Sequence, residues 1–208
     1  MLDPVRFLSN LSTGEMGFAL AKVARKMGYH VTLIHGPTGL KPPRGVKAIP
    51  VVSARDLKRA CERFFFRHDA LVMTAAVCDF TPRAYRPQKI HRTKTKQLLL
   101  RQTPDIVSGL AKKKGKRIVI GFCLETRDWL ENARRKLAQK RLDGIVANYY
   151  RPDHIPFGKR RITVGFLGPA GAPEIIRRTS KERISSRLLQ WMESMGDDVK
   201  NQFRRGQR

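Results

Sequence analysis

The stretch RIVIGFCLETRDWLENARRKLAQKRLDGIVANY, residues 117–149, decides the fold of this chain. It begins and ends with apolar runs of strand length, 117–125 and 143–149, and the segment between them is long enough for a helix. Four apolar residues of that segment recur at helical spacing: Trp129, Leu130, Ala133 and Leu137. A helix between two buried strands is typical of parallel sheets, whose faces are covered by helices. The stretch therefore predicts an α/β fold.

The same alternation of strands and helices continues on both sides of this stretch. Further strands are predicted at 30–36, 46–52, 69–77 and 97–102, and a C-terminal hairpin at 161–167 and 173–179. Further helices are predicted from Gly14 to Gly28, after Ser53, at 103–115 and at 181–195. Together they predict one three-layer α/β domain over 1–195, with a mainly parallel sheet, a hairpin appendage and a flexible basic tail at 196–208. In such sheets ligands bind beyond the carboxyl ends of the strands.

The charge of the chain is strongly positive. Its 208 residues include 43 Lys and Arg against 17 Asp and Glu, which gives a formal net charge of +26. This indicates an anionic partner, and nucleic acid, anionic lipid and phosphorylated small molecules all stay open.

The three cysteines are far apart and form no CxxC pair, which suits a reducing compartment. Because no apolar run approaches ~18–20 residues and no signal-peptide pattern occurs, we expect a soluble, cytoplasmic protein.

Two segments could hold an anion at the start of a helix. In SNLSTGEMG (9–17), Ser12 and Thr13 offer hydroxyl groups, and the two glycines allow a helix start to approach a phosphate closely. In TPDIV (103–107), Thr103 is the expected cap, and a proline at the first helical position leaves the next amides pointing outward. The alternative for both segments is an ordinary capped helix start.

Basic side chains form two further candidates. Residues 80–104 include seven Lys or Arg and no Asp or Glu, a composition that suits a mobile lid over a polyanion. Lys89 is the charge of most interest there, because Ile90 beside it could anchor it. Lys136 and Lys140 are four residues apart on one helical face and could reach the same phosphate. A solvated charged surface is the alternative for both.

The sequence contains no motif for covalent or metal catalysis. The five histidines show no metal-ligand spacing, and neither a Gly-x-Ser-x-Gly elbow nor an obvious acid–base pair is found. We therefore expect no metal site made by protein ligands and no protein nucleophile.

Seven sequence blocks follow one another in an order and spacing that resemble one family. They are DPVRFLSNLSTGEMG (3–17), TAAVCDF (74–80), PQKI (87–90), PDIV (104–107), GFCLET (121–126), ARRKLAQKRLD (133–143) and IVAN (145–148). Over roughly residues 3–158 the chain resembles the phosphopantothenate–cysteine ligases of the CTP-dependent bacterial type. The resemblance implies a Rossmann-like fold that binds no dinucleotide.

The resemblance also implies a ligase reaction in two steps. CTP activates the carboxylate of 4′-phosphopantothenate as an acyl-cytidylate and releases pyrophosphate, and the amine of cysteine then displaces CMP. Magnesium is implied with the triphosphate, a homodimer as the assembly, and a separate phosphopantothenoylcysteine decarboxylase as a metabolic partner. No membrane contact is implied, and nucleic acid is not expected as a partner.

Roles for individual residues follow from the same resemblance. Asn10 matches the asparagine that binds the acyl-cytidylate, where its amide can donate to the acyl oxygen. Lys89 matches a lysine of a flexible flap that is needed for cytidylate formation, and we expect it to face one cavity together with Asn10. The implied nucleotide-binding residues are Ser12, Ala75, Asp79, Lys89, Pro104, Asp105, Ile106, Val107, Phe122, Lys136 and Lys140.

The chain departs from the family pattern at several positions. A first strand and a GGT-like turn normally precede the block at 3–17, so we expect the sheet to lack a central strand. Glu15 stands where a lysine is common. Three alternatives therefore stay open: a nucleotide-binding relative without turnover, a basic nucleic-acid-binding protein, and a nicotinamide-dependent reductase. The second has no RNP motif to support it, and the third has no glycine fingerprint.

Overall fold

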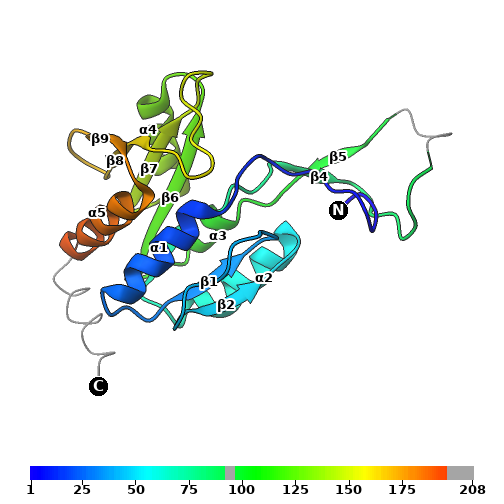
Figure 1. The fold of residues 1–208 in the computed structure, drawn as a ribbon, viewed down its shortest axis with the longest axis horizontal. Helices are drawn as coiled ribbons and strands as arrows, with labels where there is room; N and C mark the ends of the chain where they lie inside the picture. The colour runs from blue at the N-terminus through cyan, green and yellow to red at the C-terminus, as the bar shows by residue number, and fades with distance from the viewer. Residues whose placement is uncertain (92–96, 196–208) are drawn as a thin grey trace.

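The computed structural model describes residues 1–91 and 97–195. Within these ranges strands and helices alternate as the sequence predicts, and helices lie on both faces of the main sheet (Figure 1). The three-layer α/β prediction is confirmed. The tail predicted at 196–208 lies outside the described residues, as do residues 92–96 of the predicted basic lid.

The main sheet has five strands in the order β3–β6–β7–β8–β9. Their bounds are β3 Ala70–Met73, β6 Ile118–Glu125, β7 Gly144–Tyr149, β8 Ile162–Leu167 and β9 Glu174–Thr179. β3, β6 and β7 are parallel, and α4 (Trp129–Lys140) connects β6 to β7, as the stretch at 117–149 predicts. The predicted hairpin forms β8 and β9, which continue the sheet with antiparallel pairing. The hairpin is therefore part of the main sheet and not a separate appendage.

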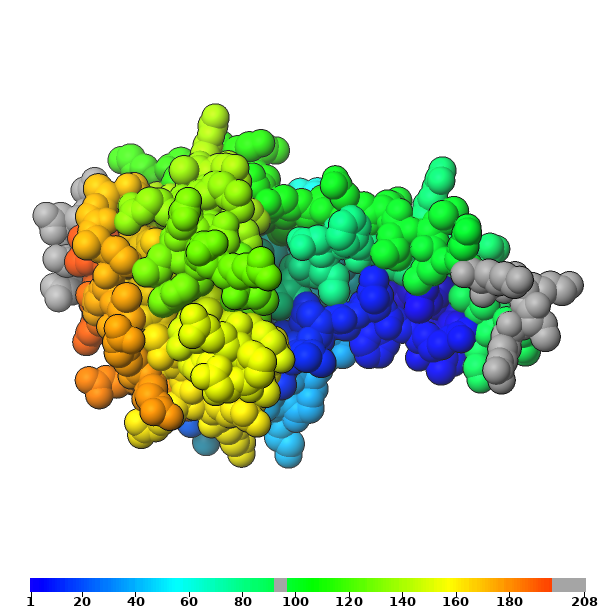
Figure 2. All heavy atoms as spheres, turned by 90° about the horizontal axis from the view of Figure 1, so that it is seen from above, coloured from blue at the N-terminus to red at the C-terminus, as the bar shows by residue number. Residues whose placement is uncertain are grey.

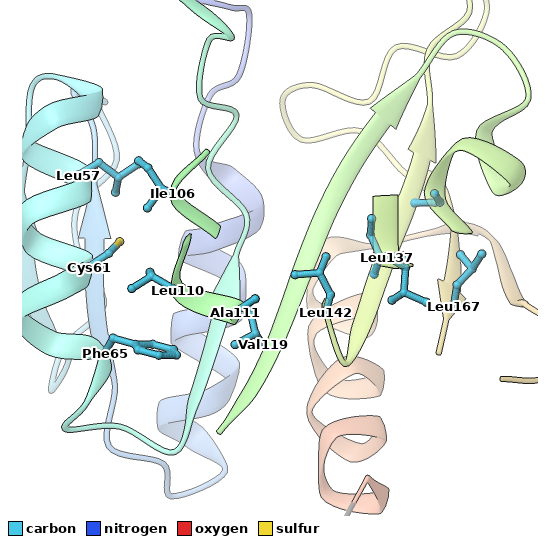
Figure 3. Packing of buried hydrophobic residues seen from close by; sticks show 13 residues of the cluster. Leu57, Cys61, Phe65, Ile106, Leu110, Ala111, Val119, Leu137, Leu142 and Leu167 are labelled. Atoms are coloured by element: carbon cyan, nitrogen blue, oxygen red, sulfur yellow. The ribbon is translucent and has the colours of Figure 1, made fainter. Parts of the chain in front are cut away.

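Helices cover both faces of this sheet because its central strands are apolar on both sides. The remaining helices are α1 Glu15–Lys26, α2 Ala54–Phe65, α3 Ile106–Ala111 and α5 Lys181–Ser194. On β6, Ile118 and Ile120 pack in one cluster with α1 and α5, whereas Val119 packs in a second cluster with α2, α3 and α4 (Figure 3). Ile120 and Val119 are fully buried, so successive residues of one strand anchor two hydrophobic cores on opposite faces.

Two helix boundaries follow the caps that the sequence predicts. Oγ of Ser53 accepts from the N–H of Asp56 at 3.2 Å, and the Asp56 carboxylate accepts from the N–H of Ser53 at 3.1 Å. This reciprocal pair is a capping box at the start of α2. Gly28 follows α1 with φ of 91°, a left-handed conformation that favours glycine after a helix.

The sheet is interrupted between β1 (Thr32–His35) and β3. β1 and β2 (Lys47–Pro50) form a separate parallel pair. An apolar cavity of about 490 Å³ is lined by both β1 and β3 and by residues of α1, α2 and α5. The strand predicted at 69–77 is the short edge strand β3 of the main sheet, and all four of its residues are half-buried. Within the described residues, β3 pairs on one side only, with β6.

A larger side chain in this cavity should stabilise the fold. Ala70 of β3 lines the cavity, and Ala70→Ile adds apolar volume and a β-branched side chain to a strand. We expect the free energy of unfolding, measured by urea denaturation, to rise by about 1 kcal/mol. The control is Ala138→Ile at an exposed position of α4, where we expect no gain. An unchanged or lower stability of Ala70→Ile would contradict the assignment of an open cavity beside β3.

Candidate functional site

A cavity of about 400 Å³ lies at the carboxyl ends of β3, β6 and β7. Parallel strands end at one edge of a sheet, which brings together the segments that follow them. Ten of the residues expected at a nucleotide site line this cavity: Ser12, Ala75, Asp79, Pro104, Asp105, Ile106, Val107, Phe122, Lys136 and Lys140. The volume lies within the usual range of small-molecule sites, ~300–1,000 Å³. We call it the nucleotide cavity.

Asn10 lines an adjoining cavity of about 320 Å³, which shares Ser12 and residues 74–78 with the nucleotide cavity. The side-chain nitrogen of Asn10 donates to the carbonyl of Ala76, and its side-chain oxygen accepts from the N–H of Ser12 at 2.9 Å. The first bond ties the loop before α1 to the segment after β3, and the second closes a turn within that loop. Asn10 is therefore held beside the segment that both cavities share.

The start of α1 packs closely against the segment that follows β3. A Cβ on Gly17 would lie 2.8 Å from Oγ1 of Thr74, so a side chain at this position would have to displace Thr74. Gly14 is the N-cap with φ of 80°, and no side chain of the described residues caps the first amides of α1. Gly14 and Gly17 both line the adjoining cavity, so these amides border a space in which an anion could bind.

The start of α3 differs from the sequence prediction. Thr103 does not cap the helix, because α3 begins only at Ile106; the N–H of Thr103 donates to the carbonyl of Asp79 at 2.8 Å in the chain before the helix. Asp105 is the N-cap, and its carboxylate accepts from the N–H of Ser108 at 3.0 Å. The prediction of Thr103 as the cap is therefore wrong, and Pro104 lies outside the helix.

Lys136 and Lys140 share a face of α4, and each lies beside a carboxylate. Nζ of Lys136 is 2.5 Å from Oε1 of Glu125, and Nζ of Lys140 is 3.0 Å from Oδ2 of Asp105. Both lysines also line the nucleotide cavity. An entering phosphate would therefore compete with these carboxylates for two ammonium groups on one wall.

The thiol of Cys123 also lines the nucleotide cavity. Burial raises the pKa of this thiol to about 11, so it stays protonated at neutral pH and is a poor nucleophile. Within residues 1–91 and 97–195, no group of three or more His, Cys, Asp or Glu side chains is arranged to hold a metal ion. The described side chains of the nucleotide cavity can therefore position a ligand and neutralise its charge.

An arm projects from the body of the molecule (Figures 1 and 2). Lys89 lies between the two strands of this arm in the sequence. The arm contains the antiparallel pair β4 (Phe80–Pro82) and β5 (Leu100–Gln102), together with the first residues of the chain. Lys89 is exposed and lines neither cavity, so the expectation that it faces one cavity with Asn10 is not met. The reason is β4, which the sequence interpretation treats as loop and whose pairing with β5 carries the segment away from the sheet.

A buried aspartate fastens this arm. Asp3 is fully buried, and its carboxylate accepts from the N–H groups of Val5 at 2.9 Å, Arg6 at 2.8 Å and Ile90 at 3.2 Å. The Arg6 guanidinium donates to the same carboxylate at 2.6 and 2.9 Å and to the carbonyl of Ile90 at 2.7 Å. The hydrogen bonds from Arg6 are the main cause that holds the pKa of Asp3 well below its usual range. We call Asp3, Arg6 and Ile90 the arm latch, which fixes the backbone next to Lys89.

The arm latch has only a weak signal in the sequence. The local signal is the order Asp-Pro-x-Arg at 3–6, in which an aspartate before a proline favours a turn closed by its own side chain. Nothing in that signal points to Ile90, which is 87 positions from Asp3 in the sequence.

Comparison with known proteins gives this site a family context. A family model described as the DNA/pantothenate metabolism flavoprotein C-terminal domain matches residues 1–195. The coenzyme A biosynthesis bifunctional protein CoaBC of Bacillus subtilis (strain 168) is 40% identical over 191 residues, which cover 91% of this chain and 47% of that protein. A cysteine/cysteine sulfinic acid decarboxylase from an unknown prokaryotic organism is 43% identical over 168 residues, which cover 78% of this chain and 47% of that protein.

The fold comparison agrees with the sequence comparison. The crystal structure of the C-terminal domain of CoaBC has a TM-score of 0.80 and 32% sequence identity, and covers 95% of this chain and 90% of that chain. The present chain spans about half the length of the curated relatives it matches. Among its described helices, none has the length and apolar character needed to cross a membrane. By sequence and by fold, the chain belongs to the DNA/pantothenate metabolism flavoprotein C-terminal domain family.

Proposed function

We propose that this chain is a CTP-dependent phosphopantothenate–cysteine ligase. The observation that carries the proposal is the nucleotide cavity, in which ten residues expected at a nucleotide site come together at the carboxyl ends of three parallel strands. The matched CoaBC proteins are named for coenzyme A biosynthesis, which supports a reaction in that metabolism. The proposed reaction joins 4′-phosphopantothenate to cysteine and converts CTP to CMP and pyrophosphate.

The first step makes the pantothenate carboxyl group reactive. A carboxylate oxygen attacks the α-phosphorus of CTP, and the bond from that phosphorus to pyrophosphate breaks. Lys136 and Lys140 neutralise charge on the triphosphate, while Phe122 and Pro104 supply an apolar wall for the nucleoside. A step of this kind depends on holding the reactants in line and on offsetting charge, which are the two things that this cavity offers.

The second step transfers the acyl group to cysteine. The cysteine amine attacks the acyl carbon, the bond to CMP breaks, and the amine gives up a proton. One N–H of the Asn10 side chain donates to Ala76, and its second N–H can donate to the acyl oxygen as negative charge develops there. No protein nucleophile takes part, in keeping with the protonated thiol of Cys123.

Magnesium is proposed to accompany the triphosphate. Asp79 is an exposed carboxylate in the nucleotide cavity, and one or two carboxylates with phosphate oxygens are the usual protein-side ligands of this ion. The donor set therefore fits a magnesium ion carried by a nucleotide, and Asp79 would hold it. The bound ion would neutralise phosphate charge.

A second copy of the chain is the partner that we propose for the arm. Large apolar side chains are exposed along the arm: Val5, Phe7, Leu8, Phe80, Tyr85, Leu98, Leu99 and Leu100. Exposed apolar surface gathered in this way is typical of an interface, and a homodimer formed through the arms would cover it. The matched CoaBC relative is named as a bifunctional protein, and we propose that the ligase acts together with a decarboxylase activity in the cytoplasm.

Pyrophosphate release tests the proposed function. We expect release only when CTP and phosphopantothenate are both present, and CMP release when cysteine is then added. The interrupted sheet between β1 and β3 favours a second candidate, a nucleotide-binding relative without turnover. Tight CTP binding without pyrophosphate release would support that candidate and reject the ligase.

Removing one cation from the wall of the nucleotide cavity should weaken nucleotide binding. We expect Lys140→Met to raise the Kd for CTP about tenfold, because a hydrogen bond to a charged group is worth about 1.5–3 kcal/mol. Isothermal titration calorimetry measures this Kd, and Lys112→Met, an exposed position at the end of α3, is the control with the same loss of charge. If Lys140→Met and the unchanged chain bound CTP with equal affinity, the proposal that Lys140 of α4 contacts the nucleotide would be contradicted.

A further inference from the structure

A strongly basic groove of about 730 Å³, separate from the cavities described above, lies along α1. Nine of its lining residues are basic: Lys22, Arg25, Lys26, Lys41, Arg44, Lys159, Arg160, Arg161 and Lys181. They come from α1, from the loop before β2, from the segment before β8 and from the first residue of α5. The fold thus gathers cations from four separate segments into one concave surface, which we call the basic groove.

Carboxylates neutralise little of this charge. Glu15 and Glu182 are the acidic residues among those lining the groove, and Glu15 lies 3.6 Å from Nζ of Lys181. Within residues 1–91 and 97–195, the other eight basic residues form no ion pair with a carboxylate. Like charges that are gathered in a concave surface raise the local potential, and an anionic ligand relieves their repulsion.

The basic groove is separate from the nucleotide cavity. Of the described residues, Lys181 alone lines both, and its ammonium already donates to the carbonyl of Gly158. The proposed ligase reaction uses none of the other eight cations. The groove therefore accounts for positive charge that the reaction does not require.

We propose that the basic groove binds the phosphodiester backbone of a nucleic-acid double helix without reading its bases. Cations spread over four segments suit a series of phosphates, and backbone contacts of this kind carry no sequence information. The one aromatic residue that lines the groove, Phe18, is 8% exposed, so the groove offers no surface on which an unpaired base can stack. A duplex, whose bases are already stacked, needs no such surface.

The groove is less suited to a lipid surface. Binding to a membrane by an exposed protein surface usually combines basic residues with large apolar side chains that enter the lipid. None of the large apolar residues that are exposed in the described chain lines this groove. The sequence lacks an RNP motif, but such a motif binds single-stranded RNA and is not needed to bind a duplex backbone.

Salt-dependent binding of a labelled duplex tests this proposal. The probe is a fluorescein-labelled DNA duplex of about 20 base pairs, titrated by fluorescence anisotropy between about 50 and 200 mM KCl, where counterion release makes affinity fall steeply. We expect the triple variant Lys22→Glu/Lys26→Glu/Arg44→Glu to bind at least about tenfold more weakly. Its slope of log K against log salt should be shallower by about 0.9 for each cation removed.

A matched control separates the groove from net charge. Lys112→Glu/Lys113→Glu/Lys116→Glu makes the same charge change at exposed positions between α3 and β6, and should bind within about threefold of the unchanged chain because distant charges are screened. A duplex RNA should bind as the duplex DNA does. Equal losses in the two triple variants would overturn the proposal, as would tighter binding of single-stranded DNA, inorganic polyphosphate or anionic vesicles than of the duplex. Unchanged unfolding and pyrophosphate release in the groove variant would show that the effect is confined to the groove.

Discussion

Lys89→Ala is expected to lower the rate of pyrophosphate release by about 10²–10³-fold, the usual cost of losing one electrostatic contact to a transition state. In the proposed first step, the ammonium of Lys89 offsets charge that grows on the α-phosphate. Because Lys89 lies between β4 and β5 of the arm and lines neither cavity, this role requires the arm to approach the nucleotide cavity when substrates bind. Lys89 is exposed, so the substitution should leave the unfolding temperature unchanged.

The measurement is single-turnover pyrophosphate release with CTP and phosphopantothenate in excess. Lys89→Arg keeps the charge and should retain more activity than Lys89→Ala, and Lys112→Ala, at an exposed position distant in sequence, should keep full activity. The Kd for CTP should change little in Lys89→Ala, because the contact forms in the transition state. A rate for Lys89→Ala equal to that of the unchanged chain would exclude the arm from the reaction.

Asp3→Asn is expected to lower the same rate by about 10–100-fold, because the arm latch holds the backbone beside Lys89 and a displaced catalytic group costs rate steeply. Asparagine keeps the shape of the side chain but loses the charge that pairs with Arg6. The Arg6 guanidinium would then be weakly held, and so would the carbonyl of Ile90 to which it donates. Faster hydrogen exchange of the Ile90 amide is the direct sign of an open latch.

A double variant shows whether Asp3 acts through Lys89. If the arm latch only positions Lys89, Asp3→Asn/Lys89→Ala should be no slower than Lys89→Ala alone. Asp128→Asn, an exposed carboxylate before α4, is the control and should be fully active. Additive losses in the double variant would show instead that Asp3 acts on the fold as a whole.

The direction of the Asp3 pKa sets the pH range in which the latch works. Its pKa in the folded chain lies below the value of about 3.9 that is usual for an unfolded aspartate, so ionised Asp3 stabilises the fold above that value. The contribution is lost as the pH falls through the folded-state pKa. Between pH 5 and pH 9, therefore, titration of Asp3 should not change the stability of the arm, and exchange of the Ile90 amide should show no step that originates from this carboxylate.

Local sequence rules predict most of the fold because most of its elements are built locally. The run from 117 to 149 forms β6, α4 and β7 as its periodicity indicates, and Ser53 caps α2 with its own side chain. The errors occur where a non-local partner decides. The strand predicted at 69–77 is short because the pairing partner on one side is β6 and the other side borders a cavity. β4 is missed because three residues ending in proline form a strand only through pairing with β5.

The candidate site follows the same rule. The carboxyl ends of parallel strands meet at one edge of the sheet by topology, which is why Ala75 and Asp79, after β3, line the same cavity as Phe122 in β6. The position of Lys89 depends on the arm, and the arm is fastened by the hydrogen bond that the N–H of Ile90 donates to Asp3, 87 positions apart. Neither the periodicity nor the residue spacing within either segment predicts that contact.

Product analysis by mass spectrometry tests the central claim most directly. A reaction that contains the chain, CTP, magnesium, 4′-phosphopantothenate and cysteine is predicted to form phosphopantothenoylcysteine and CMP in equal amounts, with far less of both when Lys89 is alanine. Nucleotide binding with no product, or product formed at the same rate when both Lys89 and Lys140 are replaced, would contradict the account.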